Sequence, residues 1–97
     1  MMIEVRRTAA FAEWLTGLRD QNAKGRIASR ISRLEHANPG DVKSVGGGIS
    51  EMRIDYGPGY RLYYATRGAA LVILLCGGDK RTQDADIRKA KALAKEL

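Results

Sequence analysis

The sequence predicts a single α+β domain, residues 1–97, in which helices pack against an antiparallel sheet and the elements follow the order β-α-α-β-β-β-α. A chain of 97 residues fits one domain. With 44% hydrophobic and 29% charged residues, its composition is that of a globular protein and not of a disordered chain. The apolar residues recur first with a helical period, then in alternation, and then again with a helical period, without a repeat or linker between them.

The N-terminal part predicts a short strand followed by two helices. Residues 3–6 alternate between apolar and charged side chains, as a strand does. Thr8 can then cap a helix. The apolar residues that follow fall on one helical face at i, i+3, i+4 and i+7: Phe11, Trp14, Leu15 and Leu18. A second helix, expected to form a hairpin with the first, starts near Asp20 and ends at Asn38-Pro39-Gly40.

The next part of the chain predicts three strands. Residues 49–56 alternate between apolar and charged side chains, which is typical of a half-buried strand. Gly57-Pro58-Gly59 predicts a turn, and the Tyr-rich residues 60–66 form the second strand of the resulting hairpin. Residues 69–76 are all apolar, which suits a central strand buried on both faces and ended by Gly77-Gly78.

The charge of the chain predicts a polyanionic partner. Seventeen Lys and Arg against eleven Asp and Glu give a net charge of +6, which suits nucleic acid, an acidic protein or a membrane surface. The longest apolar run is too short to span a bilayer and the N-terminus lacks a signal peptide, so we expect a cytoplasmic protein without a membrane partner. One cysteine, Cys76, and one histidine, His36, predict neither a disulfide nor a metal site, and no cofactor is expected.

The second predicted helix carries a basic stripe. Arg26, Arg30 and Arg33 repeat at i, i+4 and i+7, each one position before an apolar residue of the buried face. Such a stripe is a solvated helix face, a track for RNA phosphates, or a docking face for an acidic partner. The charge pattern alone does not separate these three interpretations.

The predicted hairpin places functional side chains on the sheet. If its turn centres on Pro58, Asp55 lies opposite Arg61 and Arg53 lies opposite Tyr63. Arg53, Arg61 and Tyr63 then share the face that points away from the core. One interpretation is a cross-strand Asp55–Arg61 salt bridge of modest stability. The other is a phosphate clamp of two guanidinium groups, with an aromatic ring beside it for a stacked RNA base.

The junction before the last helix is a candidate anion site. Residues 77–83 lead into a helix that Thr82 is expected to cap. Lys80 and Arg81 add positive charge where backbone amides and the helix dipole already favour an anion. The segment does not have the spacing of a Walker phosphate-binding loop, which argues against nucleotide hydrolysis. A plain turn is the alternative interpretation.

Three segments carry a resemblance to a known family. They are residues 45–54, Gly57-Pro58-Gly59-Tyr60-Arg61, and Gly77-Gly78-Asp79-Lys80 within residues 74–83. The chain resembles the HigB-like addiction-module killer proteins of the RelE/ParE toxin superfamily. The resemblance implies one RelE-like domain over residues 1–97. It also implies a type II toxin that cleaves mRNA on the ribosome and is silenced by an antitoxin, often a helix-turn-helix DNA-binding protein.

The resemblance also implies roles for particular residues. Arg61 matches the catalytic arginine beside the scissile phosphate, Arg53 lies near basic residues of the preceding strand, and Lys80 and Arg81 match a basic pair. The implied reaction is metal-independent attack of a ribose 2′-hydroxyl on the adjacent phosphate, with Arg61 and Lys80 stabilising the added negative charge.

The group that transfers the proton is left open. Ile87 stands where RelE-type relatives have a tyrosine, and its apolar side chain transfers no proton. Asp79 and Glu51 are the candidate bases. Two other functions remain open: a ParE-like toxin that binds DNA gyrase without catalysis, and a simple RNA-binding domain.

Overall fold

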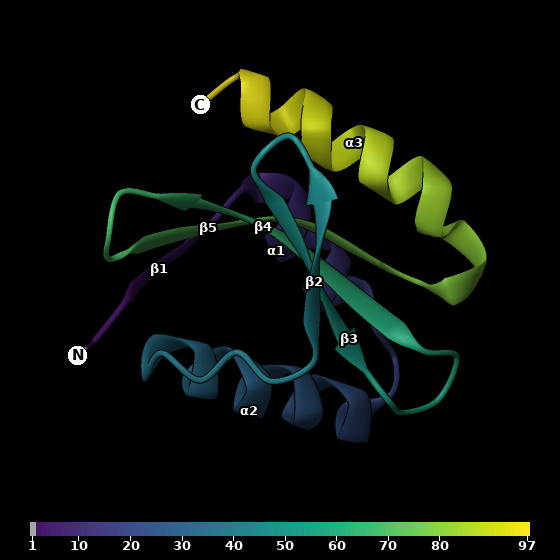
Figure 1. The fold of residues 1–97 in the computed structure, drawn as a ribbon. Helices are drawn as coiled ribbons and strands as arrows, with labels where there is room; N and C mark the ends of the chain where they lie inside the picture. Colours follow the sequence, from purple (N-terminus) through teal and green to yellow (C-terminus); the bar gives the residue numbers. More distant parts are fainter. Residues whose placement is uncertain (1) are drawn as a thin grey trace.

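The computed structural model describes residues 2–97 and contains five strands and three α-helices (Figure 1). In chain order the elements are β1 (Glu4–Arg7), α1 (Ala9–Gly17), α2 (Gln21–Glu35), β2 (Val42–Gly46), β3 (Ile49–Ile54), β4 (Tyr60–Arg67), β5 (Leu71–Asp79), a 3₁₀ turn η1 (Lys80–Thr82) and α3 (Gln83–Lys95). The strand order is β1-β5-β4-β3-β2. The pair β1–β5 is parallel and the other three pairs are antiparallel.

The α+β class and the single domain agree with the sequence prediction, but the strand count and the sheet type do not. The strand β2 was not predicted, because it is a short edge strand in which only Val42 and Val45 are half-buried. A tight turn at Gly47-Gly48, where both residues have positive φ, pairs it with β3. The sheet is mixed because β1 pairs in parallel with β5, a contact between opposite ends of the sequence that local periodicity does not encode.

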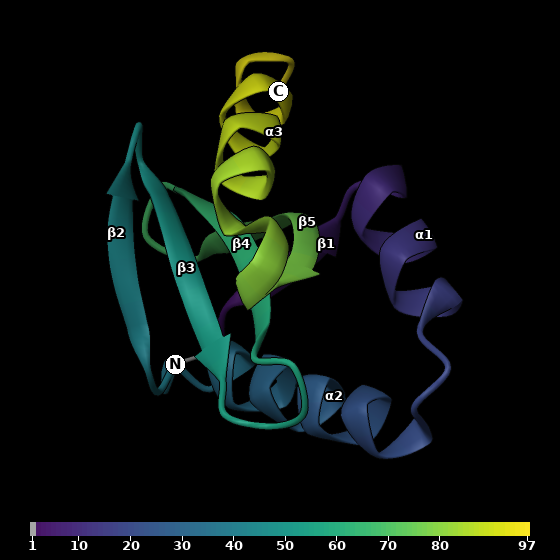
Figure 2. The same cartoon turned by 90° about the vertical axis from the view of Figure 1, so that its right-hand side faces the viewer.

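Two apolar cores lie on opposite faces of the sheet. Helices α1 and α2 cover one face, where Phe11 and Ile27 pack against strand residues such as Leu74. Helix α3 covers the other face, where Ala90 packs against Tyr63 and Leu75 (Figure 2). The strand β5 therefore lies in the interior of the sheet and is buried on both faces, as its continuous apolar sequence predicts.

The predicted starts of the first two helices are confirmed. The Thr8 hydroxyl accepts a hydrogen bond from the Phe11 amide at 3.1 Å, and the Asp20 carboxylate accepts from the amides of Asn22 and Ala23 at 2.9 and 3.2 Å. The predicted hairpin of α1 and α2 is wrong, since the two helices lie at a steep angle to each other (Figure 2). Helix α1 packs mainly on β5, whereas α2 contributes Ile27 and Ile31 to the same core from a different direction (Figure 2).

Gly77 and Gly78 do not end β5, contrary to the sequence prediction. The strand continues to Asp79, and both glycines pair with β4. A Cβ at Gly77 would overlap the indole of Trp14 on α1, and one at Gly78 would overlap the carboxylate of Asp86 on α3. The two glycines therefore let helices approach the strand backbone from both faces.

This packing predicts that Gly77→Ala lowers the free energy of unfolding by about 1–3 kcal/mol or more, because the new methyl group must displace Trp14. The matched control is Gly25→Ala on α2, where no atom lies within 4 Å of the added Cβ. That change should raise stability by roughly 0.5–1 kcal/mol, as it does at an open helical position. Urea unfolding of both variants measures the difference, and equal stability of the two would contradict the packing argument.

Candidate functional site

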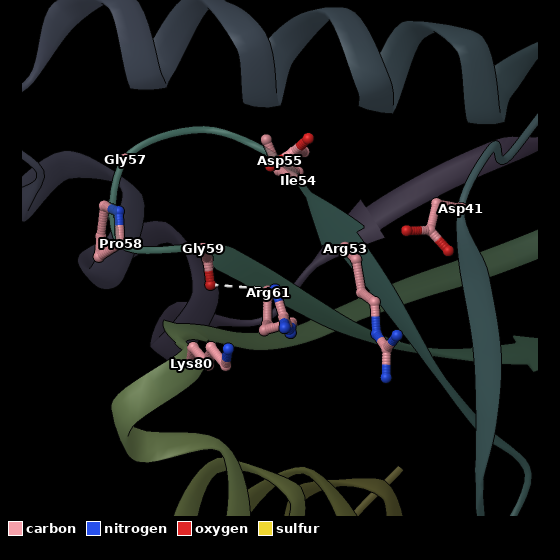
Figure 3. Close-up of a pocket in the computed structure, with 9 residues that line it drawn as sticks. All are labelled: Asp41, Arg53, Ile54, Asp55, Gly57, Pro58, Gly59, Arg61 and Lys80. Carbon is pink, nitrogen blue, oxygen red and sulfur yellow. Dashed lines mark hydrogen bonds between the residues drawn. The ribbon is translucent and has the colours of Figure 1, made fainter.

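The candidate site is a cleft of about 390 Å³ beside the β3–β4 turn (Figure 3). It is lined by two arginines, a lysine, two aspartates and the turn: Arg53, Arg61, Lys80, Asp41, Asp55, Ile54, Gly57, Pro58 and Gly59. The structure thus brings together Arg53, Arg61 and Lys80, three of the residues that the sequence singled out. They come from β3, β4 and the turn after β5.

The pairing of β3 with β4 differs from the predicted register. Arg53 lies directly opposite Arg61, and Glu51 lies opposite Tyr63. The strands end at Ile54 and restart at Tyr60, so the turn centres on Gly57 and not on Pro58. The interpretation of the hairpin as an Asp55–Arg61 salt bridge is therefore wrong. The positive side chains of Arg53 and Arg61 therefore face each other across the hairpin, and they repel each other unless a negative charge lies nearby.

Glu51 is that counter-charge. Its side chain is 0% exposed. One carboxylate oxygen, Oε1, accepts a hydrogen bond from Arg53 Nε at 3.0 Å and lies 3.9 Å from Arg61 Nε. The other, Oε2, accepts from the Tyr63 hydroxyl at 3.1 Å and from Gln83 Nε2 at 2.7 Å. The carboxylate thus contacts residues of β3, β4 and α3.

These contacts keep Glu51 ionised. Burial raises its pKa, but hydrogen bonds from Gln83, Arg53 and Tyr63 together lower the pKa below the usual value of 4.5. Burial and the charge of Glu51 raise the pKa of Tyr63. A buried carboxylate with a lowered pKa is a poor general base, so Glu51 does not suit the role that the sequence left open for it.

The Arg61 guanidinium is held near the cleft floor. Its side chain is 12% exposed, and Nη1 donates to the carbonyl oxygens of Gly59 at 3.1 Å and Tyr60 at 3.4 Å (Figure 3). Gly59 has φ +80°, and a Cβ there would lie 3.4 Å from Arg61 Nη1 and 3.5 Å from Lys80 Cβ. These distances are ordinary van der Waals contacts, so it is the positive φ at position 59 that favours glycine in this turn.

Tyr63 and Arg81 lie outside the cleft. Tyr63 shares a sheet face with Arg53 and Arg61, as predicted, but α3 covers that face there and the ring is completely buried. The prediction of an exposed ring for base stacking is therefore wrong. Arg81 is 81% exposed and pairs with Asp79 at 3.0 Å. This hydrogen bond lowers the pKa of Asp79, so that carboxylate also makes a poor base.

The predicted basic stripe on α2 is divided by the tertiary structure. Arg30 turns inward, where Nη1 donates to the Arg53 carbonyl at 2.6 Å and Nη2 donates to the Pro39 carbonyl at 2.9 Å. Arg30 therefore ties α2 to β3. Arg26 and Arg33 are exposed, and together with Arg30 they line a groove next to Ile54 and Asp55, which also border the cleft.

The sequence analysis missed two residues near the site. Gln83 begins α3 and donates to Glu51, a contact without a local signal because 32 residues separate the two. Tyr56, just after β3, packs against the apolar core, and its ring lies under the Arg26 guanidinium at 4.5 Å. Its hydroxyl donates to Asp20 at 2.8 Å. Strand periodicity gives no signal for these two contacts, because Asp20 and Arg26 belong to the start of α2.

The fold and the cleft define a small basic α+β protein whose sheet carries a cationic site at one hairpin. Residues 13–97 match the family described as phage-derived Gp49-like proteins (DUF891), and the chain belongs to that family. The Gp49-like family is a toxin-antitoxin-like family of phage-derived proteins. An uncharacterized protein of Haemophilus influenzae strain Rd is 54% identical over 97 residues, which cover 100% of this chain and 98% of that relative.

The match corrects the resemblance drawn from the sequence. Residues 45–54, the β3–β4 turn and the end of β5 resemble the HigB-like killer proteins of the RelE/ParE superfamily, whereas the family that matches is the distinct Gp49-like family. The motifs that suggested the first family are short segments of the strands and turns around the site. Within residues 2–97, no helix is both long enough and apolar enough to cross a membrane.

The role of Arg30 predicts that Arg30→Ala destabilises the fold by about 1.5–3 kcal/mol, because carbonyl groups of β3 and of the loop before β2 lose a charged donor. Arg33→Ala, at an exposed position one turn further along α2, should change stability by no more than about 0.5 kcal/mol. Urea unfolding tests the pair. Equal effects would show that Arg30 does not tie α2 to β3.

The lowered pKa of Glu51 predicts an acid-sensitive fold. Its ionised form contributes stability that is fully present above pH 4.5 and is lost as the pH falls through the folded-state pKa. Between about pH 6 and about pH 3, the unfolding free energy of the wild type should therefore fall more steeply than that of Glu51→Gln, which lacks this titration. Parallel pH curves for the two proteins would contradict the assignment.

Proposed function

We propose that this protein is the toxin of a toxin–antitoxin pair and acts as a metal-independent endoribonuclease that cleaves mRNA on the ribosome. The observation that carries the proposal is the convergence of Arg53, Arg61 and Lys80 in one cleft above a buried carboxylate. Fixed guanidinium groups bind phosphate in a forked geometry, and an ammonium group adds a point charge beside them. The toxin–antitoxin-like character of the Gp49-like family supports the biological setting.

In the proposed reaction the ribose 2′-hydroxyl attacks the adjacent phosphorus. The 2′-hydroxyl gives up its proton as its oxygen bonds to phosphorus, and the bond from phosphorus to the 5′ oxygen breaks. The departing 5′ oxygen takes up a proton, so the products are a 2′,3′-cyclic phosphate and a 5′-hydroxyl. The transition state places extra negative charge on the phosphoryl oxygens. Arg61 and Lys80 donate hydrogen bonds to these oxygens. Arg53 also binds the phosphate, from β3, the strand opposite Arg61, and its side chain is 36% exposed.

The proton transfers are assigned to groups or water that the ribosome positions. Glu51 is buried, Asp79 is paired with Arg81, and Ile87 is apolar. The two carboxylates that line the cleft, Asp41 and Asp55, lie at its rim, away from Arg61 and Lys80 (Figure 3). This arrangement supports dependence on the ribosome, because the carboxylates near the cations are buried or paired and cleavage requires a base.

Expression of the protein alone should therefore arrest growth, and primer extension on a translated transcript should reveal new 5′ ends within codons. In a purified system, cleavage of the same transcript should require ribosomes. Intact mRNA accompanied by gyrase-linked double-strand breaks would overturn the proposal in favour of a gyrase-binding toxin. Binding of RNA without any cleavage would favour a simple RNA-binding domain.

Arg61→Ala should lower the cleavage rate by about 10²–10³-fold, because the transition state loses one preorganised donor. Arg61→Lys should restore little of this rate, since an ammonium group cannot make the forked contact. The matched control is Arg6→Ala, which removes one exposed arginine from β1. Full activity of a folded Arg61→Ala protein would remove Arg61 from the proposed site.

A cognate antitoxin should cover part of the cationic surface with an acidic or amphipathic segment. Tight inhibition requires an interface of roughly 1,200–2,000 Å², and opposite charge speeds the encounter. Reversing the charge of Arg26 and Arg33 together should slow association and weaken its dependence on salt. Arg30 is left unchanged because it supports the fold. An unaltered association rate would show that the antitoxin docks elsewhere, over the cleft or on another face.

A further inference from the structure

The negative charge of Glu51 has two opposing effects on the cleft. Arg53 and Arg61 lie directly opposite each other on β3 and β4, so their guanidinium groups repel. Glu51 reduces this repulsion, but its buried negative charge also lowers the positive potential that would attract RNA. If the cleft served only to attract a polyanion, a neutral residue at position 51 would serve it better. The presence of a carboxylate there therefore points to a role in orientation.

We propose that Glu51 is a positioning residue, which holds the guanidinium groups of Arg53 and Arg61 in the orientation that the scissile phosphate requires. This inference rests on the proposed ribonuclease function. Glu51 touches neither the RNA nor the reacting atoms, since its side chain is completely buried. It acts through the two arginines, which line the cleft above it.

The carboxylate is itself fixed. Its Oε2 atom accepts two hydrogen bonds, one from the Tyr63 hydroxyl on β4 and one from Gln83 at the start of α3. Only Oε1 is left for the arginines, so these contacts determine where the negative charge lies. Because the group is shielded from water, its attraction to nearby cations is stronger than it would be at the surface.

The two arginines depend on Glu51 to different degrees. Arg53 Nε donates a direct hydrogen bond of 3.0 Å to Oε1. Arg61 Nε lies 3.9 Å from the same oxygen, is buried, and has no hydrogen-bond partner within residues 2–97. Arg61 is held in addition by the carbonyl groups of Gly59 and Tyr60. Loss of the carboxylate should therefore disturb Arg53 most and Arg61 to a lesser extent.

The test is Glu51→Gln, measured for RNA affinity and for single-turnover cleavage on the ribosome. We expect RNA to bind as tightly as in the wild type or several-fold more tightly, because a negative charge is removed beneath the cleft. We expect cleavage to slow by about 10- to 100-fold, since misplacing a catalytic group by about 1 Å has effects of this size. The control is Glu13→Gln, which removes the same charge from the exposed face of α1 and should change neither quantity.

These two readouts separate positioning from a merely structural role. Partial unfolding would lower binding and cleavage in the same proportion, and that result would overturn the proposal. An unchanged cleavage rate in a folded Glu51→Gln protein would overturn it as well. If Glu51→Gln does not fold, Tyr63→Phe keeps the ring and removes only the hydroxyl that donates to Oε2. It should slow cleavage by about three- to tenfold without weakening RNA binding.

A measurement without RNA keeps this inference separate from the proposed function. In ¹⁵N NMR spectra of the arginine side chains, the Nε–H signal of Arg53 should exchange slowly in the wild type and rapidly in Glu51→Gln, with a smaller change for Arg61. The Arg30 signal should stay the same, because its guanidinium donates to backbone carbonyl groups and not to Glu51. If wild-type protein fails to cleave RNA but these signals change as expected, the ribonuclease function fails and the positioning of the arginines stands. Unchanged Arg53 and Arg61 signals would overturn the positioning itself.

Discussion

The candidate site depends on the attraction between the buried Glu51 carboxylate and the arginine pair of the β3–β4 hairpin. Arg53 and Arg61 lie opposite each other, and the carboxylate approaches their Nε atoms at 3.0 and 3.9 Å. Tyr63 and Gln83 hold the carboxylate from β4 and α3, so the counter-charge has a fixed place. For the ribonuclease function that we propose, this arrangement means that the arginines are oriented before the phosphate binds, which is the condition under which charged donors stabilise a transition state most.

The third cation reaches the cleft because β5 continues through two glycines. Gly78 pairs with Arg61, and Asp79 pairs with Tyr60, so the residue that follows, Lys80, emerges beside the β3–β4 turn. The same glycines admit Trp14 from one face and Asp86 from the other. Close packing of helices on both faces of β5 and the placement of Lys80 are thus consequences of one short segment.

Some basic residues near the site line its cleft and the adjoining groove, and one of them also supports the fold. Arg53, Arg61 and Lys80 line the cleft, and Arg26 and Arg33 remain on the adjoining surface of α2. Arg30, which belongs to the same helical stripe, is used for hydrogen bonds to backbone carbonyl groups. A net charge of +6 therefore overstates the charge that is available to a polyanion.

The sequence by itself determined the α+β class, the helix starts at Thr8 and Asp20, the strand character of β5, and the arginines and lysine of the cleft, because these follow from local periodicity, capping and residue chemistry. Only the tertiary structure decided the parallel pairing of β1 with β5, the edge strand β2, the hairpin register and the inward turn of Arg30. It also decided the burial of Tyr63 beneath α3. The physical reason is that each of these is fixed by contacts between segments far apart in the chain, and such contacts leave no periodic pattern in either segment alone.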